Sequence, residues 1–387
     1  MDIRLPGPTP VPPQVTRAIL ETMNAPYMDY RNEEFRRVVS DTVKRLKSVF
    51  RTEGDILLLA GSGTSALQTA MVNVIGPGDT VIVAVMGFFG EYLADIAKQA
   101  GANLVRIDSE WGQPTDPEAI RDALRQHPDA KAVFVTHCET STSVVNDLKA
   151  IGDAVKGSGA LLLVDAVSSV GAIELNMDEW GIDIVAAGCQ KGLMTPPGLG
   201  VVAVNERAWD VIEKSPRPSF YFDLMRYKEF IQTGQTPYTP NVAMVKGLAA
   251  AIDLLEEEGL DNTFRRHVVL RDMTRAAMKA LGVPCLVEDD AHASPVVTTV
   301  IIDQADPHVF RSHVRSELRV ALAAGLGKLK DKTVRIAHMG YTDAGDVLKT
   351  IAAVEVGLRR VGYAVELGAG VAAAQRVWLE RQAVAHV

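Results

Sequence analysis

The stretch "DIVAAGCQKGLMTPPGLGVVAV" (residues 183–204) is the most informative about the fold, because it holds two short apolar runs on either side of a turn rich in Pro and Gly. Each run has the length and composition of a buried strand. No helical pattern separates them, so we expect the two strands to run antiparallel, at one edge of a sheet. Lys191 stands directly after the first run, among small residues, although a lysine is usually solvated.

Five further apolar runs precede this stretch, and together they predict seven strands. They begin at Ile56, Thr80, Asn103, Ala132 and Ala160. Each run is continuous rather than alternating, as in strands buried on both faces. Amphipathic patterns lie between most of them, including an Asp-Pro helix start at Asp116. We therefore predict an α/β fold with a mostly parallel seven-stranded sheet covered by helices on both faces.

The pattern changes near residue 260, which predicts two domains. We expect residues 1–260 to form an N-terminal arm and a large domain, and residues 261–387 to form a smaller C-terminal α/β domain. Long helical patterns begin at Asn262, Gly345 and Val371, and strand-like runs begin at Ser294, Arg319 and Thr333.

Composition excludes several classes of protein. The 387 residues carry a formal net charge of −8 and no basic stripe, which argues against nucleic-acid binding. The three cysteines are too far apart for a disulfide framework or a CxxC metal site, so we expect a reducing cytoplasm and no metal. The longest strongly apolar stretch, residues 81–89, is too short to span a membrane, and the N-terminus lacks the features of a signal peptide.

Two motifs at strand ends predict a place for an anion and a carboxylate. Ser62, Gly63 and Thr64 join a strand to a helix, where backbone N–H groups can bind a phosphate, although an ordinary capped turn has the same pattern. Asp165 follows the apolar "ALLLV" at the expected carboxyl end of a central strand. Either backbone N–H groups or a bound cation would satisfy it.

Two cations complete the candidate site. Burial would lower the pKa of Lys191 and free its amine for a Schiff base. A solvated lysine would keep its ordinary pKa and stay protonated. Arg335 lies inside a strand-like run and would bind a substrate carboxylate or make a structural ion pair. A phosphate loop, an Asp for a pyridine nitrogen and a Lys for an aldehyde together match the needs of pyridoxal 5′-phosphate.

The chain resembles class V aminotransferases of fold type I, specifically the alanine–glyoxylate and serine–glyoxylate group. The resemblance runs over nearly the whole chain and is most specific in the pair "VDAVSS" and "QKGLMTPPG". The other shared motifs are "PGPTPVPP", "GSGTSALQTAM", "NVIGPGD", "THCETSTSVVNDL", "MDEWGID" and "PYTP". It implies an enzyme that moves an amino group from alanine or serine to glyoxylate or pyruvate.

The resemblance also implies residue roles. Lys191 would bind the cofactor covalently, Asp165 would pair with its ring nitrogen, and Arg335 would bind the substrate carboxylate. The remaining positions that match cofactor contacts are Ser62, Gly63, Thr64, Phe89, Thr140, Gln190 and Thr239. Thr239 matches a residue that reaches the phosphate of the neighbouring subunit, which implies a homodimer with shared active sites. Tyr30 stands where the group usually has His, on the substrate side.

Several alternatives stay open. Pyridoxamine–pyruvate aminotransferases carry an acidic residue in the phosphate loop, where this chain has Ser62. An aminoethylphosphonate–pyruvate aminotransferase is a further alternative. A lyase or cysteine desulfurase is less favoured, because Gln190 replaces the His of the desulfurase His-Lys pair. A non-catalytic protein with this fold is the remaining possibility, since fold alone does not fix function.

Overall fold

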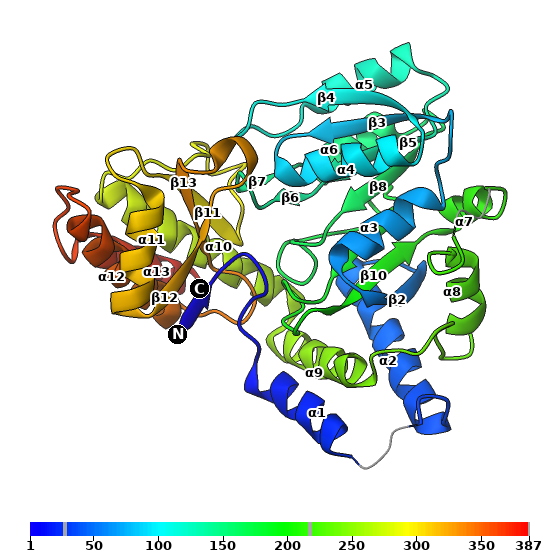
Figure 1. Cartoon of the computed structure of the whole chain (residues 1–387), viewed down its shortest axis with the longest axis horizontal. Helices are drawn as coiled ribbons and strands as arrows, with labels where there is room; N and C mark the ends of the chain where they lie inside the picture. The colour runs from blue at the N-terminus through cyan, green and yellow to red at the C-terminus, as the bar shows by residue number, and fades with distance from the viewer. Residues whose placement is uncertain (26–28, 216–218, 386–387) are drawn as a thin grey trace.

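The computed structural model describes residues 1–25, 29–215 and 219–385, which form two α/β units side by side (Figure 1). The larger unit is built on a seven-stranded sheet. In spatial order its strands are β2 (Asp55–Gly61), β10 (Gly198–Val204), β9 (Ile184–Gly188), β8 (Leu161–Asp165), β5 (Ala132–Thr136), β3 (Thr80–Val85) and β4 (Asn103–Asp108). The seven predicted strands are therefore confirmed.

Strand direction follows the connections. β10 is antiparallel to both of its neighbours, β9 and β2, and the remaining neighbours pair in parallel. The turn at residues 189–197 is too short for a crossover helix, so β9 and β10 must be antiparallel. The antiparallel strand lies one place in from the edge, because β2 pairs along its outer side.

Nine helices belong to the described part of the first 258 residues, and several begin at residues whose side chains cap the first turn. Asn32 accepts a hydrogen bond from Phe35 N–H at 2.8 Å, and Asp116 accepts one from Glu118 N–H at 2.9 Å. The helices are α1 (Pro13–Asn24), α2 (Glu33–Phe50), α3 (Gly63–Val72), α4 (Phe88–Gln99), α5 (Pro117–Gln126), α6 (Leu148–Val155), α7 (Glu206–Ile212), α8 (Leu224–Ile231) and α9 (Val242–Glu258).

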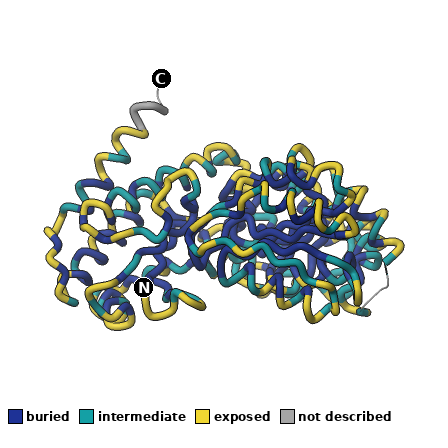
Figure 2. The backbone as a smooth tube through the Cα atoms, turned by 90° about the horizontal axis from the view of Figure 1, so that it is seen from above, coloured by how far each residue is buried: buried dark blue, intermediate teal, exposed yellow. Residues whose placement is uncertain are grey.

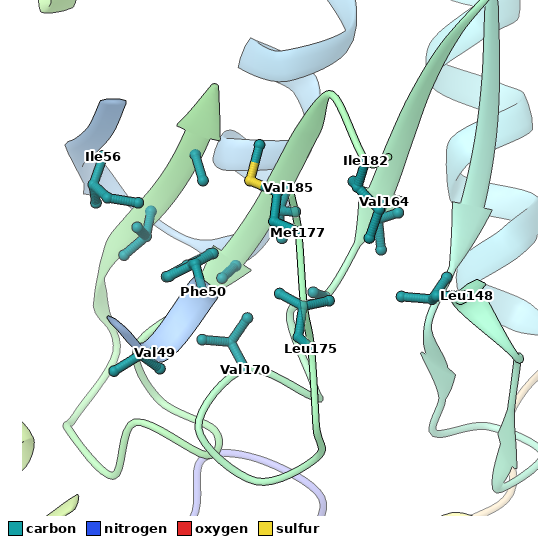
Figure 3. Packing of buried hydrophobic residues seen from close by; sticks show 14 of the residues in the cluster. Val49, Phe50, Ile56, Leu148, Val164, Val170, Leu175, Met177, Ile182 and Val185 are labelled. Atoms are coloured by element: carbon teal, nitrogen blue, oxygen red, sulfur yellow. The ribbon is translucent and has the colours of Figure 1, made fainter. Parts of the chain in front are cut away.

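The central strands of the large sheet are buried on both faces, which explains their continuous apolar runs, whereas the edge strand β4 is only half-buried or exposed. Ile56 and Val185 pack into one cluster with Phe50 of α2 (Figure 3). The residues next to them in the sequence, Leu57 and Ile184, pack into a second cluster on the opposite face. Figure 2 shows these buried strands running through the middle of the unit.

The smaller unit has its own four-stranded sheet and apolar cluster. Its strands, in spatial order, are β1 (Asp2–Arg4), β12 (Val320–Ala324), β13 (Thr333–Ala337) and β11 (Val297–Ile301). Its helices are α10 (Leu260–Ala280), α11 (Pro307–Leu318), α12 (Ala344–Arg360) and α13 (Ala369–Ala385), with a 3₁₀ turn at Gly327–Leu329.

The first strand differs from the expected division of the chain. β1 pairs in parallel with β12, so residues 2–4 lie in the C-terminal sheet rather than with the large unit. Three residues are too few for a recognisable strand pattern, and their pairing partner lies at the other end of the sequence. The domain boundary near residue 260 stays a prediction; α10 begins at Leu260.

Candidate active site

The candidate site lies where the carboxyl ends of the central strands meet the smaller unit. Asp165 is the last residue of β8, Lys191 follows β9, and the Ser62–Thr64 turn connects β2 to α3. These side chains surround a cavity of about 270 Å³, near the lower limit for small-molecule sites. Its lining comprises Gly7, Pro8, Ser62, Gly63, Thr64, Leu67, Phe89, Tyr92, Cys138, Asp165, Val167, Ser168, Gln190, Lys191 and Pro197.

The N-terminal segment holds Lys191 in place. The amine of Lys191 donates a hydrogen bond to the carbonyl oxygen of Pro6, and the side chain of Lys191 lies against Gly7. Thr9 binds the same turn, because its N–H donates to Gln190 O at 3.1 Å and its hydroxyl donates to Lys191 O at 3.0 Å. Burial, with repulsion from Arg335, lowers the pKa of Lys191 to about 8, so its amine loses its proton far more easily than an exposed lysine does.

Asp165 is a buried carboxylate with room for a cationic partner. One of its oxygens accepts a hydrogen bond from Val167 N–H at 2.9 Å, and the side chain also lines the cavity. Burial, with the negative charge of Glu139, raises the pKa of Asp165 to about 7. A cation bound in the cavity would reverse that rise by favouring the ionised form.

The start of α3 forms the opposite wall. Ser62 and Ser65 make a reciprocal capping box, so the positive end of the helix faces the cavity with Gly63 and Thr64 at its rim. A Cβ atom on Gly63 would lie 2.8 Å from Val167, which explains why only glycine fits. Gln190 Oε1 is buried without a hydrogen-bond partner in the described residues. The helix N-terminus at Gly63 can bind a phosphate, and Gln190 and Asp165 offer a free amide oxygen and a buried carboxylate. Together these groups fit a phosphorylated pyridine cofactor.

Phe89 lies in the first turn of α4 and lines the cavity, whereas Thr140 and Arg335 do not line it. The positive charge of Arg335 still acts on the amine of Lys191, whose pKa it lowers. Arg335 Nη1 donates to Thr140 O at 3.1 Å and Nε donates to Ala324 O at 2.8 Å. Burial lowers the pKa of Arg335 to about 10. The hydroxyl of Thr140 is buried without a partner in the part of the chain that the structure describes.

Thr239 and Tyr30 are two further predicted residues that, like Thr140 and Arg335, do not line the cavity. Thr239 is in the irregular segment between α8 and α9, and its hydroxyl lies 3.4 Å from the hydroxyl of Tyr30. Both side chains are partly open to solvent and neither lines the cavity. The single chain therefore does not bring Tyr30 and Thr239 together with Lys191.

Eight lining residues were not predicted from the sequence: Gly7, Pro8, Leu67, Tyr92, Cys138, Val167, Ser168 and Pro197. All except Tyr92 lie in motifs that carry the family resemblance, such as "PGPTPVPP", "THCETSTSVVNDL" and "VDAVSS". Val167 stands two residues after Asp165, and a close reading of that motif would have found it. The approach of Gly7 to Lys191 joins distant parts of the sequence and has no local signal.

Comparison with known proteins identifies the family. The profile described as Aminotransferase class-V matches residues 4–348. The chain belongs to the class-V aminotransferases. It is therefore a pyridoxal 5′-phosphate-dependent aminotransferase, and the predicted activity, cofactor and fold are confirmed.

Individual relatives carry different names. The chain is 37% identical to a serine–glyoxylate aminotransferase of Methylorubrum extorquens, over 96% of this chain and 94% of the relative. It is 40% identical to a protein of Synechococcus named soluble hydrogenase, small subunit, over 97% of each. The solved structure of pyridoxamine–pyruvate aminotransferase from Mesorhizobium loti superposes with a TM-score of 0.92 at 28% identity, over 98% of this chain and 97% of that one.

Within residues 1–25, 29–215 and 219–385, none of the helices is long and apolar enough to cross a membrane. No group of three His, Cys, Asp or Glu side chains in these ranges is arranged to hold a metal ion.

Proposed function

We propose that this chain transfers the amino group of a small neutral amino acid, alanine or serine, to glyoxylate or pyruvate. The observation that carries the proposal is one cavity that holds the amine of Lys191 and the carboxylate of Asp165, with pKa values of about 8 and about 7. The lowered pKa of Lys191 suits an amine that reacts with an aldehyde, and the raised pKa of Asp165 suits a carboxylate that binds a cation.

The chain's residues divide the work of holding the cofactor. Lys191 would bind its aldehyde covalently, and Asp165 would keep its ring nitrogen protonated. Ser62, Gly63, Thr64 and Gln190 would bind its phosphate, with Phe89 against its ring. When bound, the cofactor supplies an electron sink for the bonds around the substrate's α-carbon.

An amine and a guanidinium of this chain would carry out the proton transfer and the binding of the substrate. Lys191 Nζ, uncharged above a pH of about 8, would accept the proton from the substrate's α-carbon. Arg335 would bind and orient the substrate carboxylate, while its contacts with Thr140 and Ala324 keep the guanidinium in position.

The cavity favours a neutral donor. Lys191 is its only cationic lining residue among the described ranges, and Arg335 lies outside the lining as a single carboxylate ligand. A donor with a second carboxylate, such as aspartate, would leave that charge unpaired. Alanine and serine place no such charge in the cavity.

A second candidate is transfer from pyridoxamine to pyruvate. The TM-score of 0.92 to the Mesorhizobium loti pyridoxamine–pyruvate aminotransferase favours it. Ser62, at the rim of the cavity where that group carries an acidic residue, argues for the amino-acid donor instead.

A half-reaction screen separates these functions. Purified, cofactor-loaded protein is mixed with serine, alanine, aspartate, aminoethylphosphonate or pyridoxamine, and the absorbance of the Lys191-bound cofactor is followed. The proposal expects rapid loss with alanine or serine and recovery on adding glyoxylate or pyruvate. Rapid loss with pyridoxamine or aspartate alone would overturn it, and product release without any need for a keto acid would favour a lyase.

The exposed position of Thr239 supports a homodimer in which this residue serves the neighbouring subunit's site. A mixture of Lys191→Ala and Thr239→Asp subunits tests it. Each variant alone would be inactive, but a hybrid dimer would hold one site with both residues intact. Activity above both parents supports sharing, and its absence in proven hybrids contradicts it. The cytoplasm remains our proposal for its location, because all three cysteines are free thiols.

A further inference from the structure

Glu139 is a buried carboxylate beside the site. The proposed chemistry gives Glu139 no role. Its side chain is 0% exposed. Oε2 accepts hydrogen bonds from Phe89 N–H at 2.9 Å and Gly90 N–H at 3.1 Å, and Oε1 accepts one from Ser141 N–H at 3.0 Å. All three contacts are N–H donors, so both oxygens act as acceptors.

These contacts fix the first turn of α4. Phe88 and Phe89 are its first two residues, and Phe88 N–H donates to the hydroxyl of Ser141 at 2.9 Å. A negative charge at a helix N-terminus is stabilising. The packing is close: a Cβ atom on Gly87 would lie 2.6 Å from Ser141 Oγ and closer still to the side chain of Glu139. The position of Phe89 therefore depends on the segment Glu139–Ser141.

The same segment reaches the substrate side. Between Glu139 and Ser141, the carbonyl oxygen of Thr140 accepts the hydrogen bond from Arg335 Nη1 at 3.1 Å. Arg335 lies on β13 of the smaller unit, whereas Phe89 lies on α4 of the larger one. Three consecutive residues thus connect the aromatic wall of the cavity to its carboxylate ligand.

We propose that Glu139 is a positioning residue that sets the aromatic ring of Phe89 and the guanidinium of Arg335 in a fixed relation across the two units. The proposal rests on the proposed function, which gives Phe89 the cofactor ring and Arg335 the substrate carboxylate. Through them, Glu139 fixes the angle between the substrate carboxylate and the ring, which the reaction requires.

The direct test is Glu139→Gln, which keeps the size of the side chain. A glutamine offers one acceptor oxygen and one NH₂ donor, so it cannot receive N–H groups on both sides. We expect the dissociation constant of pyridoxal 5′-phosphate, from absorbance titration, to rise about tenfold. The circular dichroism of the bound cofactor should change in amplitude, because the ring loses its fixed orientation. The KM of the best donor in the screen should rise more than kcat falls.

Glu355→Gln is the matched control. Glu355 is also a buried carboxylate at a helix start, where it accepts N–H groups of Gly368, Gly370 and Val371 at the beginning of α13. Both variants should lower the melting temperature, but only Glu139→Gln should change the cofactor's dichroism and dissociation constant. Equal changes in both variants, or none in Glu139→Gln, would overturn the proposal.

A milder variant covers the case in which Glu139→Gln fails to fold. Ser141→Ala removes the acceptor of Phe88 N–H without placing a new donor in the interior, and we expect the same changes in smaller size. Unchanged dichroism in Ser141→Ala would then count against the proposal. Cofactor affinity and dichroism are measured without turnover, so they test Glu139 even if the wild-type protein transfers no amino group and the proposed function fails.

Discussion

The side chain of Lys191 packs against the backbone of Gly7, so that a Cβ atom on Gly7 would lie 2.7 Å from Lys191 Nζ. Gly7 has a φ of +126°, a conformation that other residues rarely adopt. The segment that places it there is anchored in the smaller unit through β1 and at the lysine turn through Thr9. The N-terminal segment thus forms one wall of the site.

Gly7→Ala should displace the amine of Lys191. We expect kcat to fall at least about tenfold, because a shift of an ångström misplaces the reacting atom. The absorbance of the Lys191-bound cofactor should fall with it. Gly157→Ala is the control, since Gly157 also has a positive φ (+82°) but nothing within 4 Å of its Cβ position. Equal losses in both variants would show that backbone strain alone is responsible.

The amine of Lys191 should react with electrophiles at a lower pH than an exposed lysine. Its pKa of about 8 lies below the ordinary value of 10.5, so the uncharged, reactive form gains as pH rises through about 8. Competitive acetylation of the cofactor-free protein, read by peptide mass spectrometry with exposed Lys149 as reference, measures it. In Arg335→Met, loss of the neighbouring positive charge should raise the midpoint. A midpoint near 10.5 in the wild type would contradict the burial.

The same shift predicts a stability change with pH. The pKa of Lys191 is lower in the folded state than the ordinary value of 10.5. The contribution of Lys191 to the free energy of unfolding is therefore fully present above about pH 10.5 and is lost as pH falls through about 8. The cofactor-free Lys191→Met variant should therefore gain stability over the wild type most clearly below pH 8. Urea unfolding at several pH values measures the difference, and a constant difference across this window would count against it.

Asp165→Asn should lower kcat strongly while leaving the shape of the cavity intact. An opposite charge moves a pKa by ~1–3 units, so its loss should reduce the protonated fraction of the ring nitrogen roughly a hundredfold. Asp183→Asn is the control, because Asp183 is also buried but accepts a hydrogen bond from Leu162 N–H at 2.7 Å and does not line the cavity. A kinetic effect of Asp165→Asn no larger than that of Asp183→Asn would contradict the assignment.

Arg335→Lys should raise the KM for glyoxylate about thirtyfold, since a bidentate, charge-assisted contact is lost while the charge remains. Arg311→Lys provides the comparison, because Arg311 also donates through Nε to a backbone carbonyl of β12, that of Leu322. Steady-state kinetics with varied glyoxylate measure both. An unchanged KM in Arg335→Lys would remove this arginine from substrate binding.

The sequence predicted the large sheet because most of its strands are buried on both faces and read as continuous apolar runs, as in β8 before Asp165. It also placed Lys191, Asp165 and the Ser62 turn together, because carboxyl ends of neighbouring strands converge. The contacts of Lys191 with Pro6 and Gly7 could not be predicted, since Pro6 and Lys191 are 185 positions apart in the sequence. The contact between Thr239 and Tyr30 outside the cavity joins residues 209 positions apart, which local patterns do not describe.

The measurement that tests the account most directly is reduction of the cofactor-loaded protein with borohydride, followed by peptide mass spectrometry. The account predicts one reduced cofactor per chain, attached to Lys191 and absent from Lys191→Ala. A label on any other lysine, or a loaded protein in which Lys191 remains unmodified, would contradict it.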